Sequence, residues 1–281
     1  MKKILVTGGA GFVGTNLLSK LKEFNFELYS IDNYCIGKKN NHLEGINYIE
    51  EDVNNILDYD LKFDIIFHLA ALSRIQPSFL DPVTTYNYNT TGTLRVLEYA
   101  KKNSSKVIYA GSSSKHHVPS SSPYAMTKFL GEELCKLYNK SFDLDIHIVR
   151  FYNVYGPFEI LEGDWAALIG KWRNQVKLNQ PLTIVGDGEQ KRDFTHVSDI
   201  VDGLIKISNT ESTNLEWELG SGKNYSINEV FELFKRKFNC RSHNVENQKG
   251  NYQVTLRLND DALKILNWKP KGDLENYINN L

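Results

Sequence analysis

The sequence predicts an α/β fold: a doubly wound parallel sheet followed by a smaller, mixed α/β C-terminal lobe. Short runs rich in β-branched residues alternate with helix-length segments up to Arg150, and these runs are apolar on both faces. Strands of this kind lie in parallel sheets that helices cover on both sides. Because crossovers between parallel strands are right-handed, the sheet is predicted to be doubly wound.

Strands and amphipathic helices alternate in this first part of the chain. The predicted strands are Lys3–Thr7, Glu27–Asp32, Asn47–Glu51, Asp64–His68, Lys106–Ala110 and Asp145–Arg150. The predicted helices are Gly11–Phe24, Pro82–Lys102 and Pro123–Phe142. We assign residues 1–152 to the sheet domain, and we expect a segment near residues 194–222 to return to it.

The rhythm changes after Arg150, and residues 153–281 are predicted to form the smaller lobe. A helix is predicted at Trp165–Leu178, a strand at Leu182–Val185 and a turn at Asp187-Gly188. These elements are too irregular to extend the sheet on their own. We therefore expect them to lie against it, with the ligand cleft between the two parts.

Composition and charge exclude several classes of protein. The chain has 281 residues, with 33 Lys or Arg and 34 Asp or Glu, and its net charge of −1 provides no attraction to nucleic acid or an anionic membrane. No apolar stretch approaches the ~20 residues that span a bilayer. Cys35, Cys135 and Cys240 are far apart and lack metal-ligand spacing. We expect reduced thiols, no metal site and a cytoplasmic location.

A glycine-rich turn follows the first predicted strand and opens the first helix. Gly8 permits a tight turn, Gly11 lets the backbone approach a pyrophosphate, and Gly14 allows close packing of helix on strand. Asp32 ends the second strand 18 residues after Gly14, where it can bind ribose hydroxyls and repel a 2′-phosphate. The pattern predicts a Rossmann-type site for NAD rather than NADP, unless Lys38-Lys39 folds back toward it.

Tyr124 and Lys128 lie four residues apart, on one face of a predicted helix. A tyrosine has an ordinary pKa of about 10, and a neighbouring ammonium and a cationic nicotinamide would lower it toward neutrality. Ser112 follows a strand at the carboxyl edge of the sheet, where such folds bind ligands. The three residues predict proton transfer from a substrate alcohol; the alternative is two surface residues and a serine-rich turn.

The chain resembles the extended short-chain dehydrogenases/reductases, specifically the NAD-dependent nucleotide-sugar epimerases and dehydratases. It is most similar to UDP-glucose/UDP-GlcNAc 4-epimerases, and the resemblance covers nearly the whole chain. The motifs that carry it are Thr7–Gly14, Asp52-Val53, His68–Ala71, Asn89–Thr93, Tyr124 with Lys128, Arg150–Pro157, Gly186–Phe194 and Trp268–Pro270.

The resemblance implies further site residues. Asp52 and Val53 would hold the adenine, Asn89 would lie near the nicotinamide, and Lys128 would bind its ribose as well. The implied cofactor contacts also include Phe12, Val13, Asn33, Leu69, Ala70, Ala71, Ser73 and Phe151. The implied substrate contacts are Ser113, Asn153 at the diphosphate, Arg192 as its clamp and Thr255 near the sugar C2, where a small side chain would admit an N-acetyl group.

The implied reaction is C4 epimerisation of a UDP-hexose, either UDP-glucose/galactose or the N-acetyl forms. Tyr124 takes the proton of the sugar 4-hydroxyl, with Ser112 bridging, while the C4 hydride passes to NAD. The resulting 4-keto sugar turns about its diphosphate and takes the hydride back on its other face. The family also implies a homodimer through the helices Pro82–Lys102 and Pro123–Phe142.

Departures from the family pattern bear on the alternatives. Dehydratases carry an Asp-Glu pair where this chain has Ser113 and Ser114, which argues against a 4,6-dehydratase. His116 or His117 is either an extra acid/base, as a keto-sugar epimerase or reductase needs, or a surface residue.

Two further points concern phosphate binding and catalysis. Gln248–Asn251 replaces the family's Arg-x-Gly-Asp, which leaves Lys249 or Arg257 as a substitute phosphate ligand. A non-catalytic NAD-sensing scaffold is the alternative of another class. Such scaffolds usually lose the catalytic tyrosine, lysine and serine, and this chain keeps all three.

Overall fold

Seven parallel strands form the central sheet of the computed structural model, which describes residues 1–281. Their order is β11-β6-β5-β4-β1-β2-β3, so the winding direction reverses between β1 and β4. The strands are β1 (Lys2–Thr7), β2 (Phe26–Asp32), β3 (Asn47–Glu50), β4 (Ile65–His68), β5 (Lys106–Ser112), β6 (Ile146–Phe151) and β11 (Glu216–Leu219). The predicted fold and its six strands are confirmed, and β11 adds an edge strand from the second half of the chain.

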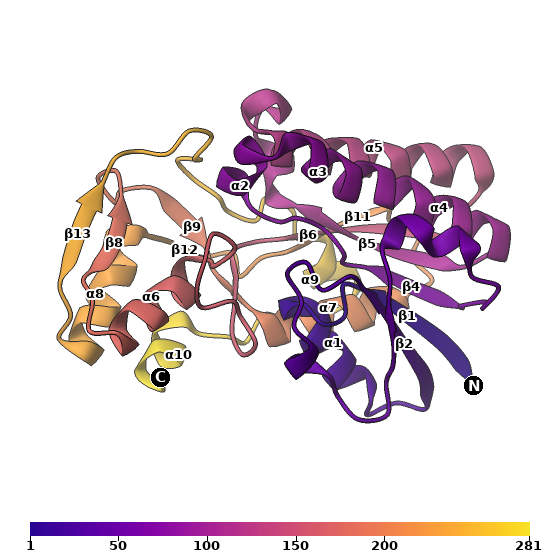
Figure 1. Cartoon of the computed structure of the whole chain (residues 1–281), viewed down its shortest axis with the longest axis horizontal. Coiled ribbons are helices and arrows are strands. Elements are labelled where there is room, and N and C mark those ends of the chain that lie inside the picture. Colours follow the sequence, from indigo (N-terminus) through magenta and orange to yellow (C-terminus); the bar gives the residue numbers. More distant parts are fainter.

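Helices cover both faces of this sheet (Figure 1). One layer contains α1 (Phe12–Leu21), α7 (Val197–Ser208) and α9 (Asp261–Ile265). The other contains α2 (Ile75–Leu80), α3 (Pro82–Tyr86), α4 (Gly92–Asn103) and α5 (Pro123–Phe142). Each layer encloses its own apolar core, with Leu17 and Ile200 buried on one face and Leu97 and Tyr109 on the other. No helix in the chain combines the length and apolarity needed to cross a bilayer.

The helix predicted at Pro82–Lys102 is not one regular helix. A π-helical turn at Asn87–Thr91 separates α3 from α4. Asn89 lies in this turn with 1% of its surface exposed, and its side chain hydrogen bonds to the backbone of Leu72 and to Thr127. The wider turn directs a polar side chain into the core, a feature that apolar periodicity does not reveal.

The smaller lobe has its own core and three two-stranded sheets, β10-β7, β12-β9 and β13-β8. Its strands are β7 (Val154–Tyr155), β8 (Leu182–Val185), β9 (Lys191–Asp193), β10 (Thr195–His196), β12 (Asn224–Ser226) and β13 (Ser242–Val245). Its helices are α6 (Leu168–Lys177), α8 (Ile227–Phe238) and α10 (Leu274–Asn279). Trp172 of α6 packs edge-on against Phe234 of α8, with ring centroids 5.4 Å apart. The strand predicted at Leu182–Val185 is confirmed, and the predicted helix begins three residues later than expected.

The C-terminal segment is fastened to α7 in the sheet domain. Trp268 is fully buried, and its indole Nε1 donates a hydrogen bond to the backbone oxygen of Asp199 at 2.9 Å. The Asp199 carboxylate accepts from the backbone N–H groups of Lys271 and Gly272 at 2.9 and 2.8 Å. These contacts join the end of the chain to the middle of the fold.

We expect Trp268→Ala to lower the free energy of unfolding by about 3–5 kcal/mol, because it removes a large core side chain and leaves a cavity. Urea denaturation measures this value. Leu258→Ala is the control, since Leu258 is 67% exposed and should cost no more than about 0.5 kcal/mol. Equal losses in the two variants would contradict the anchoring role of Trp268.

Candidate active site

A cavity of about 660 Å³ lies at the carboxyl ends of the strands, between the sheet and the smaller lobe. Residues from both parts of the chain line it. The predicted site residues that do so are Gly8, Gly11, Phe12, Val13, Gly14, Asp32, Asn33, Val53, Leu69, Ala70, Ala71, Ser73, Ser112, Ser113, Tyr124, Lys128, Phe151, Asn153, Arg192 and Thr255. Positions spread over most of the sequence therefore meet in one cleft.

The glycine turn fits a diphosphate. A Cβ on Gly14 would lie 2.2 Å from the oxygen of Gly8, and a Cβ on Gly8, whose φ is +72°, would lie 2.9 Å from the Ala70 backbone. Gly11 caps α1 without a side chain, so no protein group shields the first N–H groups of the helix from the cavity. Free N–H groups at a helix N-terminus bind phosphate oxygens.

Asp32 ends β2 with 8% of its surface exposed. Its carboxylate accepts hydrogen bonds from the N–H groups of Ala10 and Tyr34 at 2.9 and 2.8 Å, while burial raises the pKa of Asp32 above its usual value. Neither Lys38 nor Lys39 lines the cavity, and Lys39 forms an ion pair with Glu50 at 2.5 Å. A carboxylate rather than a lysine therefore lies at the end of β2, an arrangement that suits the ribose hydroxyls of NAD better than the 2′-phosphate of NADP.

The predicted catalytic groups converge where β5 meets α5. The Tyr124 hydroxyl donates a hydrogen bond to Ser112 Oγ at 3.3 Å, and Lys128 Nζ donates to the Ala110 oxygen at 2.9 Å. Ser122 caps α5 by accepting from the N–H of Ala125 at 3.1 Å. This cap fixes the start of the helix, one turn from the lysine, and so directs both side chains toward the end of β5.

A model of the NAD dependent epimerase/dehydratase family matches residues 4–220. The chain belongs to this family. UDP-glucuronate 4-epimerase of Thermodesulfobacterium geofontis is 32% identical over 305 residues, which cover 96% of this chain and 92% of that protein.

Solved structures agree with this assignment. The UDP-glucose 4-epimerase of Thermotoga maritima, solved with UDP-glucose, has a TM-score of 0.91 at 26% identity and covers 99% of this chain and 96% of its own. The Bacillus cereus UDP-glucuronic acid 4-epimerase, solved with UDP-glucuronic acid and NAD, has a TM-score of 0.89 at 28% identity and covers 98% and 96%. The predicted family and the use of NAD are confirmed.

Two residues that were predicted to contact the cofactor, Asp52 and Asn89, do not line the cavity. Asp52 accepts from the N–H of Asn54 at 2.8 Å and so caps the short helix Val53–Asp58. Asn89 is buried, with its amide bound to Leu72 and Thr127. Both side chains are held by partners within the protein. Their contacts with the cofactor, which the family resemblance implies, stay predictions.

The lowering of the Tyr124 pKa that is expected from the ammonium and the nicotinamide together stays a prediction, because burial acts against it in the protein. Burial raises the pKa of Tyr124 above its usual value, although the Ser112 hydrogen bond and the charge of Arg74 act in the opposite direction. Burial also lowers the pKa of the Lys128 ammonium to about 8. Desolvation of the phenolate thus outweighs the neighbouring charges, and the tyrosine needs further positive charge to act as a base near neutral pH.

His116 and His117, in the segment that follows Ser112, do not line the cavity. His116 Nε2 lies 2.5 Å from Glu218 Oε1, and His117 stacks on Tyr252 with ring centroids 3.8 Å apart. These positions do not support the extra acid/base that the sequence left open. Instead, His116 joins the loop after Ser112 to strand β11.

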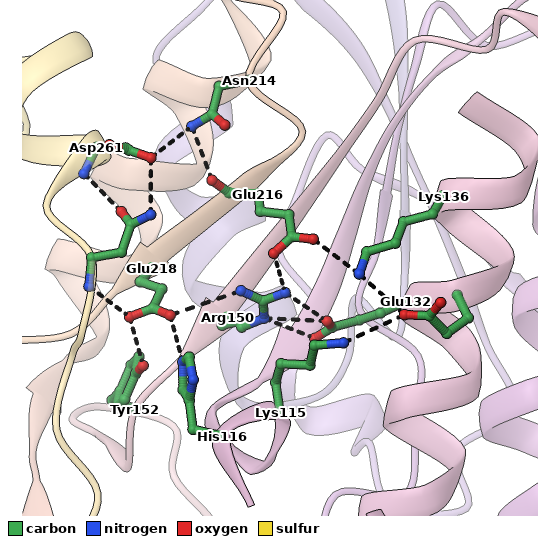
Figure 2. Close-up of polar contacts among 12 residues, drawn as sticks. Lys115, His116, Glu132, Lys136, Arg150, Tyr152, Asn214, Glu216, Glu218 and Asp261 are labelled. Carbon is green, nitrogen blue, oxygen red and sulfur yellow. Dashed lines mark hydrogen bonds and ion pairs between the residues drawn. The ribbon is translucent and has the colours of Figure 1, made fainter. Parts of the chain in front are cut away.

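Figure 2 shows the buried network that receives His116. Although burial favours the neutral acid, hydrogen bonds from His116, the Leu258 backbone and Tyr152 lower the pKa of Glu218 to about 2. Arg150 on β6 binds Glu132 of α5 at 2.8 Å and Glu216 of β11 at 2.6 Å. The network therefore connects the segment that contains His116, helix α5 and the edge strand β11 of the sheet.

Other lining residues escaped sequence analysis. Arg74, Glu159 and Trp165 lie in irregular segments where no local pattern marks them. Neither substitute phosphate ligand that the sequence suggested lines the cavity. Arg257 binds Asp260 at 2.9 Å, and Lys249 lies over the ring of Phe79. Arg74 is recognised as a candidate site residue only when the contacts of the cations in the cavity are compared, because no sequence motif contains it.

We expect Glu218→Gln to reduce the dependence of stability on pH. A carboxylate whose pKa is lower in the folded than in the unfolded state stabilises the fold above the unfolded pKa, and this stability is lost as the pH falls toward about 2. Between pH 7 and pH 3.5 the free energy of unfolding of the unmodified protein should thus fall by about 1 kcal/mol more than that of the variant. Urea denaturation at both pH values measures the difference.

The matched control is Glu232→Gln, because Glu232 is an exposed residue of α8 that pairs only loosely with Lys235 at 3.6 Å. The free energy of unfolding of this variant should depend on pH in the same way as that of the unmodified protein. If Glu218→Gln behaves in the same way as this control, the network does not hold Glu218 ionised.

Proposed function

We propose that the protein is an NAD-dependent UDP-hexose 4-epimerase. The observation that carries the proposal is the contact between the Tyr124 and Ser112 hydroxyls at 3.3 Å, beside Lys128 and inside a cavity that also contains a diphosphate-sized glycine turn. The similar enzymes from Thermotoga maritima and Bacillus cereus were solved with UDP sugars. These relatives support UDP as the nucleotide and C4 as the reacting carbon.

In the proposed reaction, the glycine turn and Asp32 would hold NAD, which would supply the acceptor and donor of hydride at C4. Tyr124 accepts the proton of the sugar 4-hydroxyl, and Ser112 relays it through their hydrogen bond. Lys128 adds positive charge near the phenol and binds ribose hydroxyls. Asn153 and Arg192 hold the diphosphate, about which the 4-keto sugar turns before it is reduced on its other face.

The dehydratase alternative lacks a second proton shuttle. Ser113 lines the cavity, and Ser114 is buried with its hydroxyl unpartnered, but neither hydroxyl is an acid near neutral pH. A 4-epimerase needs only the tyrosine and the serine. The scaffold alternative is disfavoured because the tyrosine, serine and lysine are all present and in contact with the same strand.

The role of Thr255 at the sugar C2 stays a prediction. Thr255 is 6% exposed, and its hydroxyl accepts from the Asn153 side chain at 2.9 Å. It therefore also orients a proposed diphosphate ligand. A small side chain here is compatible with both the glucose and the N-acetylglucosamine series.

Proton NMR of the protein with UDP-glucose and with UDP-GlcNAc, without added NAD, tests the proposed function. We expect anomeric signals of the galacto isomer at constant total sugar. Tyr124→Phe should slow this turnover by about 10²–10⁴-fold, the usual contribution of a general base, while NAD remains bound.

The matched control is Tyr155→Phe, which removes a buried hydroxyl that has no partner and does not line the cavity. It should leave the rate unchanged. Signals of a 4-keto-6-deoxy sugar would indicate a dehydratase. Turnover that survives Tyr124→Phe would contradict the assigned base.

We also propose that the enzyme is a homodimer and works in the cytoplasm. Val83, Leu94 and Leu137 are 77%, 37% and 52% exposed on α3, α4 and α5, which form the outer layer on one face of the sheet (Figure 1). Exposed apolar side chains on adjacent helices favour a helical interface between two copies. The reduced state of Cys35 and Cys240 in cell extracts would support the cytoplasmic location.

Light scattering at micromolar concentration should give twice the chain mass of 32.2 kDa. The double variant Leu94→Glu/Leu137→Glu should give the mass of one chain, because it places charged side chains in the proposed apolar interface. A single mass for the unmodified protein would contradict the dimer.

A further inference from the structure

Arg74 is a cation of the cavity wall with almost no protein partners. It precedes α2 and lines the cavity together with the proposed catalytic residues. Its Nε donates one hydrogen bond, to the backbone oxygen of Trp165 at 3.0 Å, and it forms no ion pair within 4 Å. The two terminal nitrogens of the guanidinium therefore keep their donors available to a ligand in the cavity.

The other cations of the cavity are engaged or exposed. Lys128 donates to Ala110, and Arg192 uses one terminal nitrogen on the Lys191 oxygen at 2.9 Å and the other on Asn251 at 2.6 Å. Lys171 lies on the surface at the rim. Among these cations, Arg74 is the one with an unused guanidinium fork.

No acidic residue of the cavity forms a hydrogen bond or an ion pair with Arg74. The charge of Glu159 acts on Arg74 only through space, because Glu159 Oε1 is paired with Arg173 at 2.7 Å and its Oε2 has no hydrogen-bond partner. Asp32 lies at the adenosine end, and Asp164 is exposed and forms no ion pair. Burial lowers the pKa of Arg74, which reflects the cost of keeping this charge out of water. An anionic ligand group would remove that cost.

Arg74 directly precedes α2, and the Ser78 hydroxyl of this helix accepts a hydrogen bond from the backbone N–H of Tyr124 at 3.1 Å. Arg74 therefore lies on the side of the cavity where Tyr124 and Ser112 line it. A planar guanidinium binds a carboxylate through two parallel hydrogen bonds. We propose that Arg74 binds a carboxylate on the sugar, so that the preferred substrate is a UDP-hexuronate. This inference rests on the proposed epimerase function. Similar enzymes from Bacillus cereus and Thermodesulfobacterium geofontis are named for UDP-glucuronate.

The test compares kcat/KM for UDP-glucuronic acid and UDP-glucose, using the NAD-loaded protein. The unmodified enzyme prefers UDP-glucuronic acid. Arg74→Gln lowers this preference by about 10- to 100-fold, mainly through KM, because it removes charged hydrogen bonds to the carboxylate. Arg74→Lys keeps part of the preference, since a point charge replaces the fork.

The matched control is Arg95→Gln, an exposed arginine of α4 outside the cavity, which keeps the full preference. Calorimetry with UDP alone gives equal affinities for Arg74→Gln and the unmodified protein. A weaker affinity for UDP would place Arg74 at the diphosphate and overturn the proposal. Equal losses of kcat on both sugars, with a shifted pH profile, would make Arg74 an electrostatic partner of Tyr124 and also overturn it.

A failure of the proposed function gives a different result. If the unmodified protein turns over neither sugar, the epimerase proposal is wrong, and calorimetry with the two UDP sugars still decides the role of Arg74. An affinity for UDP-glucuronic acid that exceeds that for UDP-glucose only while Arg74 is present supports carboxylate binding. Equal affinities in both proteins overturn it.

Discussion

The ion pair between Arg150 and Glu132 joins the central sheet to the helix that carries Tyr124 and Lys128. Both side chains are buried, at 5% and 1% exposure, and two N–H groups of the guanidinium contact the carboxylate. Removing Arg150 would leave the Glu132 carboxylate unpaired inside the protein, at a cost of about 3–5 kcal/mol. The pairing therefore favours one placement of α5 on β5 and β6 over any that separates the two charges.

The same placement depends on close packing at two glycines. A Cβ on Gly131 of α5 would lie 2.1 Å from the Tyr109 hydroxyl oxygen, and a Cβ on Gly111 of β5 would lie 2.9 Å from Glu132. Without these side chains, α5 lies directly against β5. The phenol of the helix can then reach the serine at the end of the strand. The catalytic geometry thus follows from the packing of this helix and strand.

Local patterns in the sequence were sufficient to predict the first half of the fold and most of the cavity. The glycine turn and Asp32 lie next to strands whose apolar runs are easy to recognise, so their meeting point follows from the topology. The burial of Asn89 was not predicted, because a π-helical turn interrupts the apolar periodicity of the helix there. Arg74 was missed because its isolation is visible only once every carboxylate around it has a position. The effect of burial on the pKa of Tyr124 was not predicted, because the sequence does not give the degree of burial.

Burial acts on the charged groups of the cavity in one consistent way. It raises the pKa of Tyr124 and lowers the pKa of Arg74, so the protein alone disfavours both the phenolate and the buried guanidinium. An anionic ligand group beside Arg74 would offset the cost of burying the guanidinium. The same negative charge would counter the stabilisation that Arg74 gives a phenolate, because the two side chains interact. The positive charge that Tyr124 needs for proton transfer is then left to Lys128 and a cationic nicotinamide, so substrate recognition and proton transfer depend on different cations of the cavity.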